Sequence, residues 1–419
     1  MTSIQVFVEI DGETRSAGEL KSTLRRGSLS STFIYDRDYL THQDAYPLDP
    51  IMPLSGRTWH PRGSLPSSFL DSAPDRWGRN LIRKRCQFEA TRQGIPLQTL
   101  DDRDYLLGVS DVSRQGALRF KRTPNGEFEH PSTEIPRLVE LPRLLRASDR
   151  IVTDDDDFEA VKTLLDAGTG SLGGARPKAS VQSNGRLMIA KFPHHSDAWD
   201  VMAWEKTALD LALSAGISVP ESTLLSVGNR SVLLLDRFDR SGAERIGYVS
   251  AMTMCNSRDG EQRDYLDIVD AMTMHGTEVT KDLRELWRRI AFSIGIRNTD
   301  DHLRNHGFLR SSSAGGWQIS PIFDINPNPE PGAGRATTIG GISRGAPEEA
   351  ASLFNIKDYF DLTANQARTI LDEVLHALSH WKTVAAKNGI SEREIKRFDV
   401  AFQLGHEALA LAASSPTLD

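Results

Sequence analysis

The stretch Arg297-Asn-Thr-Asp-Asp-His-Leu-Arg-Asn-His306 decides how this chain is interpreted, and it follows a predicted helix over residues 281–297. Four residues separate the carboxylate of Asp300 from the amide of Asn305. In phosphoryl transfer, a carboxylate accepts the proton of the attacking hydroxyl, and a side-chain oxygen holds Mg²⁺ beside the phosphates. The spacing suits these two roles, because the base must face the nucleophile while the amide turns back toward the metal.

The same Asp-to-Asn spacing occurs in the H-R-D-x-x-x-x-N catalytic loop of protein kinases. The pattern therefore predicts that Asp300 is the proton acceptor and that Asn305 binds Mg²⁺. Asp301 competes for the role of base, although it stands one residue too close to Asn305. His302 is either a nucleotide contact or a capping histidine, and the sequence leaves both open.

A glycine-rich stretch stands immediately before a predicted strand and reads Gly168-Thr-Gly-Ser-Leu-Gly-Gly-Ala-Arg-Pro-Lys178. Glycine permits backbone angles that let successive N–H groups converge on phosphate oxygens. The Walker A pattern G-x-x-x-x-G-K-[ST] is absent. Taken alone, the stretch is compatible with a phosphate cradle and with a plain loop.

Lys191 closes the strand that follows the glycine-rich stretch and a predicted hairpin at Asn184-Gly185. A kinase places a lysine on such a strand, where its ammonium meets the ATP phosphates. Glu205 is the predicted partner, because it lies in a mostly apolar stripe of the helix predicted over residues 198–215, where a carboxylate needs a cation. The alternatives are an edge lysine and a glutamate at the rim of the stripe.

Asp324 interrupts the apolar run Ser320-Pro-Ile-Phe-Asp-Ile-Asn326. A kinase needs a second acidic metal ligand after its catalytic loop, usually within D-F-G. Here Phe323 precedes the aspartate and the glycine is missing, so a turn residue is the alternative. The motifs nevertheless follow one another in the order that kinase-like phosphoryl transfer requires: glycine-rich stretch, strand lysine, helix glutamate, Asp-x4-Asn, aspartate.

The composition is that of an acidic globular protein of two or three domains. The chain has 419 residues, with 50 Lys and Arg against 57 Asp and Glu and a formal net charge of −7, which argues against a protein that coats nucleic acid with its whole surface. It contains two cysteines, too few for a disulfide framework. We expect a cytoplasmic protein without membrane spans, because there is no run of 18 apolar residues and no signal-peptide pattern at the start.

The order of predicted elements gives an α+β fold in three parts. Residues 1–150 form a small mixed α/β module, residues 151–239 a β-rich lobe and residues 240–419 a mostly helical lobe. The best boundary candidate contains four aspartates, residues 154–157, which we interpret as a solvated helix N-terminus. The fold class expected is a small N-terminal module followed by a bilobed, protein-kinase-like core.

Over nearly its whole length, the chain resembles the HipA family of bacterial serine/threonine-kinase toxins. Ser171-Leu-Gly-Gly-Ala-Arg-Pro-Lys178 is similar to the glycine-rich loop of the family, and Thr299-Asp-Asp-His-Leu-Arg-Asn305 to its T-D-x-H-x-x-N catalytic loop. Ile322-Phe-Asp-Ile325 resembles its metal-binding segment. Phe69-Leu-Asp-Ser-Ala-Pro-Asp-Arg-Trp-Gly-Arg79 resembles the L-P-D-x-W-G segment of its N-terminal module.

The resemblance implies a kinase that uses ATP and Mg²⁺ and assigns a role to each motif residue. Asp300 would be the base, and Asn305 and Asp324 the Mg²⁺ ligands. The remaining nucleotide contacts would come from Gly173, Gly174, Ala175, Arg176, Pro177, Lys178, Lys191, Asp236, Arg237, Phe238, His302 and Phe323, of which Asp236–Phe238 would flank the adenine at the hinge between lobes. Glu205 would pair with Lys191.

Ser171 would be the autophosphorylated serine of the family, whose modification expels the loop and switches the kinase off. Added negative charge in a phosphate cradle should oppose ATP binding, so the physics agrees. Thr169 is a second candidate, and a loop hydroxyl that closes a turn is the alternative for Ser171. Arg176 and Asp301 depart from the residues common in the family, but the base and the metal ligands are intact.

The family also implies partners. A small HipB-like helix-turn-helix antitoxin would bind the chain and carry most contacts to operator DNA, and the protein substrate would be translation-related, such as an aminoacyl-tRNA synthetase. Two other functions stay open: a phosphotransferase acting on a small molecule, and an ATP-binding co-repressor subunit without turnover.

Overall fold

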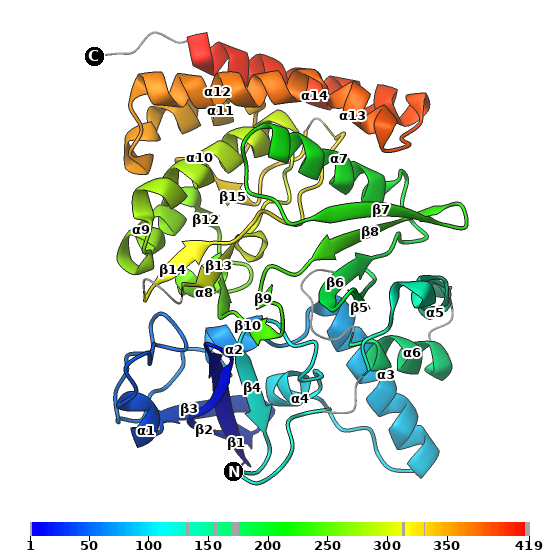
Figure 1. Ribbon diagram of the computed structural model, residues 1–419, viewed down its shortest axis with the longest axis vertical. Helices are drawn as coiled ribbons and strands as arrows, with labels where there is room; N and C mark the ends of the chain where they lie inside the picture. The colour runs from blue at the N-terminus through cyan, green and yellow to red at the C-terminus, as the bar shows by residue number, and fades with distance from the viewer. Residues whose placement is uncertain are drawn as a thin grey trace. The chain divides into compact units, whose positions relative to one another are not determined.

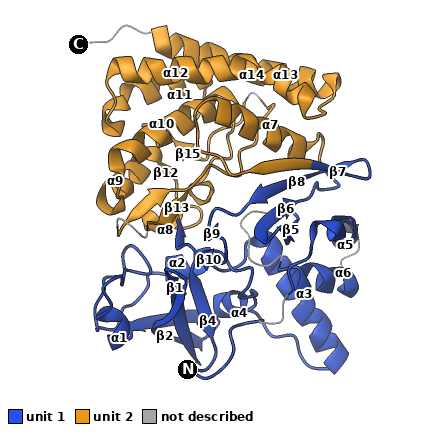
Figure 2. Ribbon diagram, in the orientation of Figure 1, with its two compact units in different colours: residues 1–196, 225–249 blue, residues 197–224, 250–419 orange. Residues whose placement is uncertain are grey.

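The computed structural model describes residues 2–130, 134–153, 157–168, 176–311, 315–330 and 332–414 (Figure 1). They fall into two compact units (Figure 2). Unit 1 comprises Met1–Ser196 and Leu225–Val249, and unit 2 comprises Asp197–Leu224 and Ser250–Asp419. The division into three parts at residues 150 and 239 stays a prediction, and each unit is described by itself below.

The described part of unit 1 is built on two four-stranded sheets with helices between them in sequence, and β9 and β10 pair as a short antiparallel ribbon. Its elements are β1 (Thr2–Ile10), β2 (Glu13–Arg25), β3 (Ser28–Tyr35), α1 (Arg37–Leu40), α2 (Ser67–Asp71), α3 (Arg76–Gln93), α4 (Asp102–Leu107), β4 (Leu118–Lys121), η1 (Leu138–Glu140), α5 (Leu141–Thr153), α6 (Phe158–Asp166), β5 (Lys178–Ser183), β6 (Arg186–Lys191), β8 (Arg230–Asp236), β9 (Arg240–Ser241) and β10 (Glu244–Arg245).

The first sheet has the order β3-β2-β1-β4. Side chains of β1 alternate between the two faces, so that Ile4, Val6 and Val8 are fully buried. The hairpin between β1 and β2 turns at Asp11 and Gly12, both with positive φ. Strand β2 was not predicted from the sequence.

The second sheet has the order β5-β6-β8-β7, where β7 spans Ser222–Val227. β5 and β6 form the hairpin predicted at Asn184-Gly185, and both turn residues have the positive φ that this hairpin requires (49° and 77°). The pairing sets Lys178 opposite Lys191. The glycine-rich stretch therefore leads directly into this sheet.

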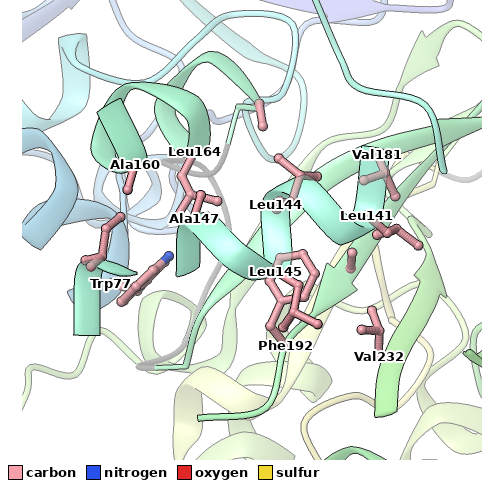
Figure 3. Close-up of a cluster of buried hydrophobic side chains, with 14 of the residues drawn as sticks. Trp77, Leu141, Leu144, Leu145, Ala147, Ala160, Leu164, Val181, Phe192 and Val232 are labelled. Atoms are coloured by element: carbon pink, nitrogen blue, oxygen red, sulfur yellow. The ribbon is translucent and has the colours of Figure 1, made fainter. Parts of the chain in front are cut away.

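A cluster of buried hydrophobic side chains joins α3 to the second sheet (Figure 3). Trp77 of α3, Leu144 of α5 and Leu164 of α6 pack in one cluster with Phe192, which follows β6, and Val232 of β8. At about 25 cal/mol per Å² of apolar surface, burying such side chains is the main stabilising term of this unit. The tryptophan of the Pro-Asp-Arg-Trp-Gly segment is thus a core residue.

The four aspartates between α5 and α6 were predicted to form a solvated helix N-terminus, and the structure describes one of them, Asp157. Asp157 is the N-cap of α6 and accepts a hydrogen bond from the amide of Ala160 (3.1 Å), as expected for an aspartate at a helix N-terminus. Asp154–Asp156 lie outside the described residues.

Unit 2 is mostly helical. Its elements are α7 (Val201–Ser214), α8 (Ala251–Met254), β12 (Arg263–Asp264), α9 (Tyr265–His275), α10 (Val279–Gly295), η3 (Leu303–Asn305), β13 (Gly307–Arg310), β14 (Trp317–Ile319), β15 (Thr337–Thr338), α11 (Ala346–Asn355), η4 (Lys357–Phe360), α12 (Ala364–Ser379), α13 (Trp381–Lys387) and α14 (Glu392–Ser414), while β11 (Tyr248–Ser250) begins in unit 1. No helix in the described ranges combines the length and the apolar composition that crossing a bilayer requires.

The buried helix α10 carries the catalytic-loop sequence at its C-terminal end. It packs against α14 at a point where both helices have a glycine. A Cβ atom on Gly405 would lie 2.2 Å from the carbonyl oxygen of Gly295, so only glycine allows this approach. Close packing at this point fixes the end of α10, and with it the start of the loop that follows.

Candidate active site

The loop begins with a sharp reversal after α10. Arg297 has a left-handed backbone (φ 56°), while its amide donates to the carbonyl of Ile294 and the amide of Asn298 to that of Ser293. These bonds satisfy carbonyls that a helix end otherwise leaves without partners. The reversal turns the chain back along α10, and residues 299–306 follow from this fixed point.

Asp300 projects from the loop toward solvent. Partial loss of hydration raises the pKa of its carboxyl group, and the carboxylates of Asp324 and Asp301 raise it further, while His302 opposes them. The net shift is upward, which makes Asp300 a better proton acceptor than an isolated aspartate. The charge of Asp324 therefore acts on Asp300, and both residues belong to unit 2.

Asn305 is buried, and its side-chain amide donates to the backbone carbonyl of Asp300 (3.0 Å). Its nitrogen is therefore engaged, and its oxygen faces away from that bond. Asp324 has a left-handed backbone (φ 57°), which an aspartate tolerates better than most residues, and the preceding Ile322 is anchored by its amide to the carbonyl of Ser218 (2.9 Å).

These residues fit a magnesium–nucleotide complex. Mg²⁺ in kinases is held by one or two protein oxygens together with substrate phosphates, so Asn305 and Asp324 are a sufficient protein contribution. No group of three or more His, Cys, Asp or Glu side chains in the described ranges is arranged as a metal site by itself. Nδ1 of His302 and Oδ1 of Asn326 are buried without a hydrogen-bond partner among the described residues, as expected for groups that meet a ligand.

Asp301 faces the opposite way from Asp300. Its buried carboxylate accepts hydrogen bonds from the hydroxyls of Tyr265 and Ser293 and lies 3.0 Å from Nε2 of His306. Burial would raise the pKa of this carboxyl group, but His306, Arg335 and the Tyr265 hydroxyl hold it well below its usual range. A buried carboxylate that is surrounded by Tyr265, Ser293 and His306 has no path to a substrate hydroxyl, so the geometry favours Asp300 over Asp301 as the base.

A cavity of about 400 Å³ borders the loop within unit 2. His302, Leu303 and Arg304 form one wall, and the residues from Arg258 to Arg263 form another. Arg304 pairs with Asp259 (2.8 Å) at a solvent-exposed position. Charged side chains of both signs line the cavity, and His302 in its wall lies two residues after the predicted base in sequence.

In unit 1, Lys178 forms a buried ion pair that the sequence did not predict. Its ammonium lies 2.8 Å from Oδ2 of Asp75, and both side chains are at most 7% exposed. The other oxygen of Asp75 caps α3 by accepting from the amide of Gly78 (2.7 Å). The aspartate of the Pro-Asp-Arg-Trp-Gly segment thus holds the last residue of the glycine-rich stretch.

The rest of the glycine-rich stretch is only partly described. Pro177 accepts a hydrogen bond from the amide of Phe192 (2.9 Å), which fixes the stretch to the end of β6, and Arg176 is partly exposed. Thr169, Ser171, Gly173, Gly174 and Ala175 lie outside the described residues. Their predicted roles stay predictions.

The predicted lysine–glutamate pair involves both units. Lys191 is buried at the end of β6 in unit 1, and Glu205 is buried on α7 in unit 2. The rim alternative for Glu205 is wrong, because the side chain is only 1% exposed. The ion pair itself stays a prediction.

The predicted hinge residues lie at the end of β8. Asp236 pairs with Arg186 (2.6 Å), and Phe238 is half-buried with its ring centroid 6.3 Å from that of Tyr248. The side chain of Arg237 is buried and bound to Asp239 (2.6 Å), so a role beside the adenine would fall to its backbone.

Sequence reasoning missed residues that support the site from behind. Tyr265, His306, Arg335 and Glu349 form a buried polar cluster behind the catalytic loop, in which Arg335 pairs with Glu349 (3.1 Å). His306 closed the quoted loop but had no assigned role. Tyr265 and Glu349 carry no local pattern, because their significance depends on contacts far along the chain.

Comparison with known families and structures identifies relatives. The HipA-like C-terminal domain family matches residues 170–381, just over half of the chain, and the HipA N-terminal domain family matches residues 8–100. The toxin YjjJ of Escherichia coli is 26% identical over 80% of the chain and 72% of its own length. The serine/threonine-protein kinase CtkA of Helicobacter pylori is 29% identical over 35% of the chain, and the match spans 48% of CtkA.

Among the solved structures that match is one that covers nearly the whole chain. HipA in the complex of Shewanella oneidensis HipA, HipB and operator DNA superposes with a TM-score of 0.66 at 14% identity and covers 99% of this chain and 100% of its own. At that identity the likeness shows the fold alone. It confirms the predicted α+β class, with a small N-terminal module followed by a kinase-like core of a β-rich and a mostly helical lobe.

Proposed function

The chain belongs to the HipA family, and on that premise we propose that it is an ATP- and Mg²⁺-dependent serine/threonine protein kinase. The catalytic loop carries the proposal: Asp300 is a solvent-facing carboxylate with a raised pKa, near Asp324, and its carbonyl is bonded to Asn305. Likeness to a serine/threonine-protein kinase and to a toxin supports the same activity class.

The roles follow from position and charge. Asn305 and Asp324 would hold Mg²⁺, which neutralises charge on the transferred phosphoryl group when bound. Lys191 and the glycine-rich stretch would orient the phosphates, and His302 would contact the nucleotide. Asp300 would accept the proton of the acceptor hydroxyl as its oxygen attacks the γ-phosphorus of ATP, while the bond from that phosphorus to the β–γ bridging oxygen breaks and ADP leaves. The cavity beside His302 and Arg304 would receive residues that flank the acceptor in a protein substrate.

The biological setting is proposed from the family. A HipB-like antitoxin would bind the chain, as in the Shewanella complex, and would carry most operator contacts. The substrate would be a translation-related protein such as an aminoacyl-tRNA synthetase, modified in the cytoplasm with growth arrest as the result.

Radiolabelled ATP tests the proposal directly. Purified chain, Mg²⁺ and γ-labelled ATP are incubated with a cell extract, and label is counted in protein and in small molecules separately. We expect Mg²⁺-dependent label on protein serine or threonine. Label confined to a soluble metabolite would favour the small-molecule phosphotransferase, and ATP binding without any transfer would favour the co-repressor subunit.

Replacing Asp324 by asparagine is expected to raise the Mg²⁺ concentration for half-maximal activity by about tenfold or more. Asparagine keeps the size and the tolerance of a left-handed backbone but removes the charge that attracts the cation. Initial rates are measured across a Mg²⁺ titration. An unchanged Mg²⁺ dependence would remove Asp324 from the list of metal ligands.

A Ser171→Ala variant is expected to keep its initial rate during prolonged incubation with ATP, while the wild type loses activity. Phosphorylation of Ser171 would add nearly two negative charges beside the triphosphate site and lower ATP affinity by about tenfold or more. Rates and incorporated phosphate are followed together. Ser226→Ala, at an exposed hairpin serine, is the matched control and should decay like the wild type. Equal decay of all three proteins would exclude autoinhibition through Ser171.

A further inference from the structure

The catalytic loop is fixed from one side at several successive residues. The guanidinium of Arg335 donates to the carbonyl of Asn298 (3.1 Å), and the amide of Ala336 donates to the carbonyl of Thr299 (2.9 Å). The hydroxyl of Thr337 donates to the carbonyl of Asp301 (2.7 Å). The segment 335–337 therefore holds the backbone on both sides of Asp300 but leaves the Asp300 side chain outside this set of bonds.

The carboxylate of Asp301 points into this support. Tyr265 at the start of α9, Ser293 of α10 and His306 at the end of the loop all converge on it. It therefore ties the loop to two helices and ties its beginning to its end. Adjacent residues 300 and 301 face opposite environments, one exposed and the other 5% exposed.

We propose that Asp301 is a positioning residue: its buried carboxylate, held by Tyr265, Ser293 and His306, fixes the loop so that Asp300 and Asn305 keep the orientation phosphoryl transfer needs. The effect of Asp301 on the rate of phosphoryl transfer rests on the proposed kinase function. Its effect on the conformation of the loop does not depend on that function. A misplacement of reacting groups by about 1 Å can cost about 10²-fold in rate, so a support of this kind should act mainly on kcat.

Further buried polar residues lie behind those that bond Asp301. Arg335, which bonds Ser293 (2.9 Å) and Asn298, is itself paired with the fully buried Glu349 of α11. Buried polar networks of this kind are satisfied as a unit, so removing one member should loosen the others. The loss of the Asp301 carboxylate or of the Tyr265 hydroxyl should therefore loosen the backbone along residues 298–306.

Hydrogen exchange of the loop is the first test, and it needs no activity. The variants are Asp301→Asn, which removes the charge at constant shape, and Tyr265→Phe, which removes only one hydroxyl. We expect amides of peptides covering 298–307 to exchange at least about tenfold faster in both, while α10 and α14 stay protected. Tyr39→Phe is the matched control, because it removes a buried tyrosine hydroxyl bonded to the Tyr46 carbonyl (2.8 Å) in unit 1. Unchanged exchange of the loop in both variants would overturn the proposal.

Steady-state kinetics with ATP is the second test. We expect kcat to fall by about 10–100-fold in Asp301→Asn and by about 3–10-fold in Tyr265→Phe, with KM for ATP within about twofold of the wild type. The double variant should be no slower than Asp301→Asn alone, since both changes break the same contact. Tyr39→Phe should lower the melting temperature without changing kcat per folded molecule.

Three results would contradict the positioning role. The first is a fall in kcat no larger than the fraction of unfolded protein explains. The second is a raised KM for ATP with kcat unchanged, and the third is a double variant whose loss of kcat equals the combined losses of the two single variants. Complete inactivity of Asp301→Asn beside an active Asp300→Asn would make Asp301 the base instead. If the wild type transfers no phosphate, the proposed function fails, and the exchange experiment still decides whether Asp301 holds the loop.

Discussion

Replacing Asp300 by asparagine is expected to lower the rate of phosphoryl transfer by about 10²–10⁴-fold, the range that a general base contributes. Asparagine has nearly the same shape but cannot accept the proton of the attacking hydroxyl. Because the Asp300 side chain is exposed and the bond from Asn305 goes to its backbone carbonyl, the loop should keep its structure in the variant. ATP binding should persist, since one negative charge near the phosphates has been removed. Initial rates at saturating MgATP and nucleotide affinity measure the two effects separately.

Asp358→Asn is the matched control for this experiment. Asp358 is an exposed aspartate of η4 that makes only a surface pair with Lys357 (3.4 Å), so its replacement should leave the rate unchanged. A rate for Asp300→Asn within about threefold of the wild type would show that Asp300 is not the base.

Replacing Asp239 by asparagine is expected to reduce the free energy of unfolding by about 3–5 kcal/mol. The carboxylate is buried between two arginines, and its Oδ2 lies 2.6 Å from Nη2 of Arg237 and 2.9 Å from Nη1 of Arg240. The same oxygen accepts a hydrogen bond from the amide of Gly116 (2.7 Å). Without its charge, two buried guanidinium groups lose their counter-ion. Such a loss is a large part of the 5–15 kcal/mol that typically separates folded from unfolded protein. Urea unfolding measures it.

The same carboxylate should make the protein sensitive to acid. Burial alone would raise the pKa of Asp239, but Arg237 and Arg240 hold it well below its usual range. In the unfolded chain, Asp239 therefore binds a proton near pH 4, whereas in the folded chain it stays ionised at that pH. The free energy of unfolding consequently falls as the pH drops below about 4. Asp239→Asn should lack this component of the acid dependence. Asp399→Asn removes one half of a surface pair with Lys382 and should cost less than about 1 kcal/mol; a similar cost for Asp239→Asn would contradict the prediction.

The sequence predicted the parts of the site that depend on local spacing. The Asp300–Asn305 pattern, the hairpin at Asn184-Gly185 and the helix ahead of the loop are all set by residues close in sequence, and the structure has the hairpin and the helix where they were expected. Strand β2 was missed because its sequence is rich in charged and small residues, and its burial follows from pairing on both sides with β1 and β3.

Ion pairs between residues far apart in the sequence could not be predicted from local sequence patterns. Lys178 was assigned to phosphate because it ends a glycine-rich stretch, yet its partner Asp75 lies 103 positions away. Asp301 was an open alternative for the base, and only the burial of its carboxylate against Tyr265 and His306 separates it from Asp300. Arg237 resembled a hinge residue in sequence, while its side chain is committed to Asp239.

The ion pair of Asp75 with Lys178 has a consequence for how such proteins can be recombined. The two residues sit in segments that match different families, the N-terminal domain (8–100) and the C-terminal domain (170–381). A chimera that joins the first segment of one relative to the second of another would bring a buried charge without its counter-charge wherever the donors differ at either position. We expect such a chimera to keep its stability only where the aspartate and the lysine are transferred together.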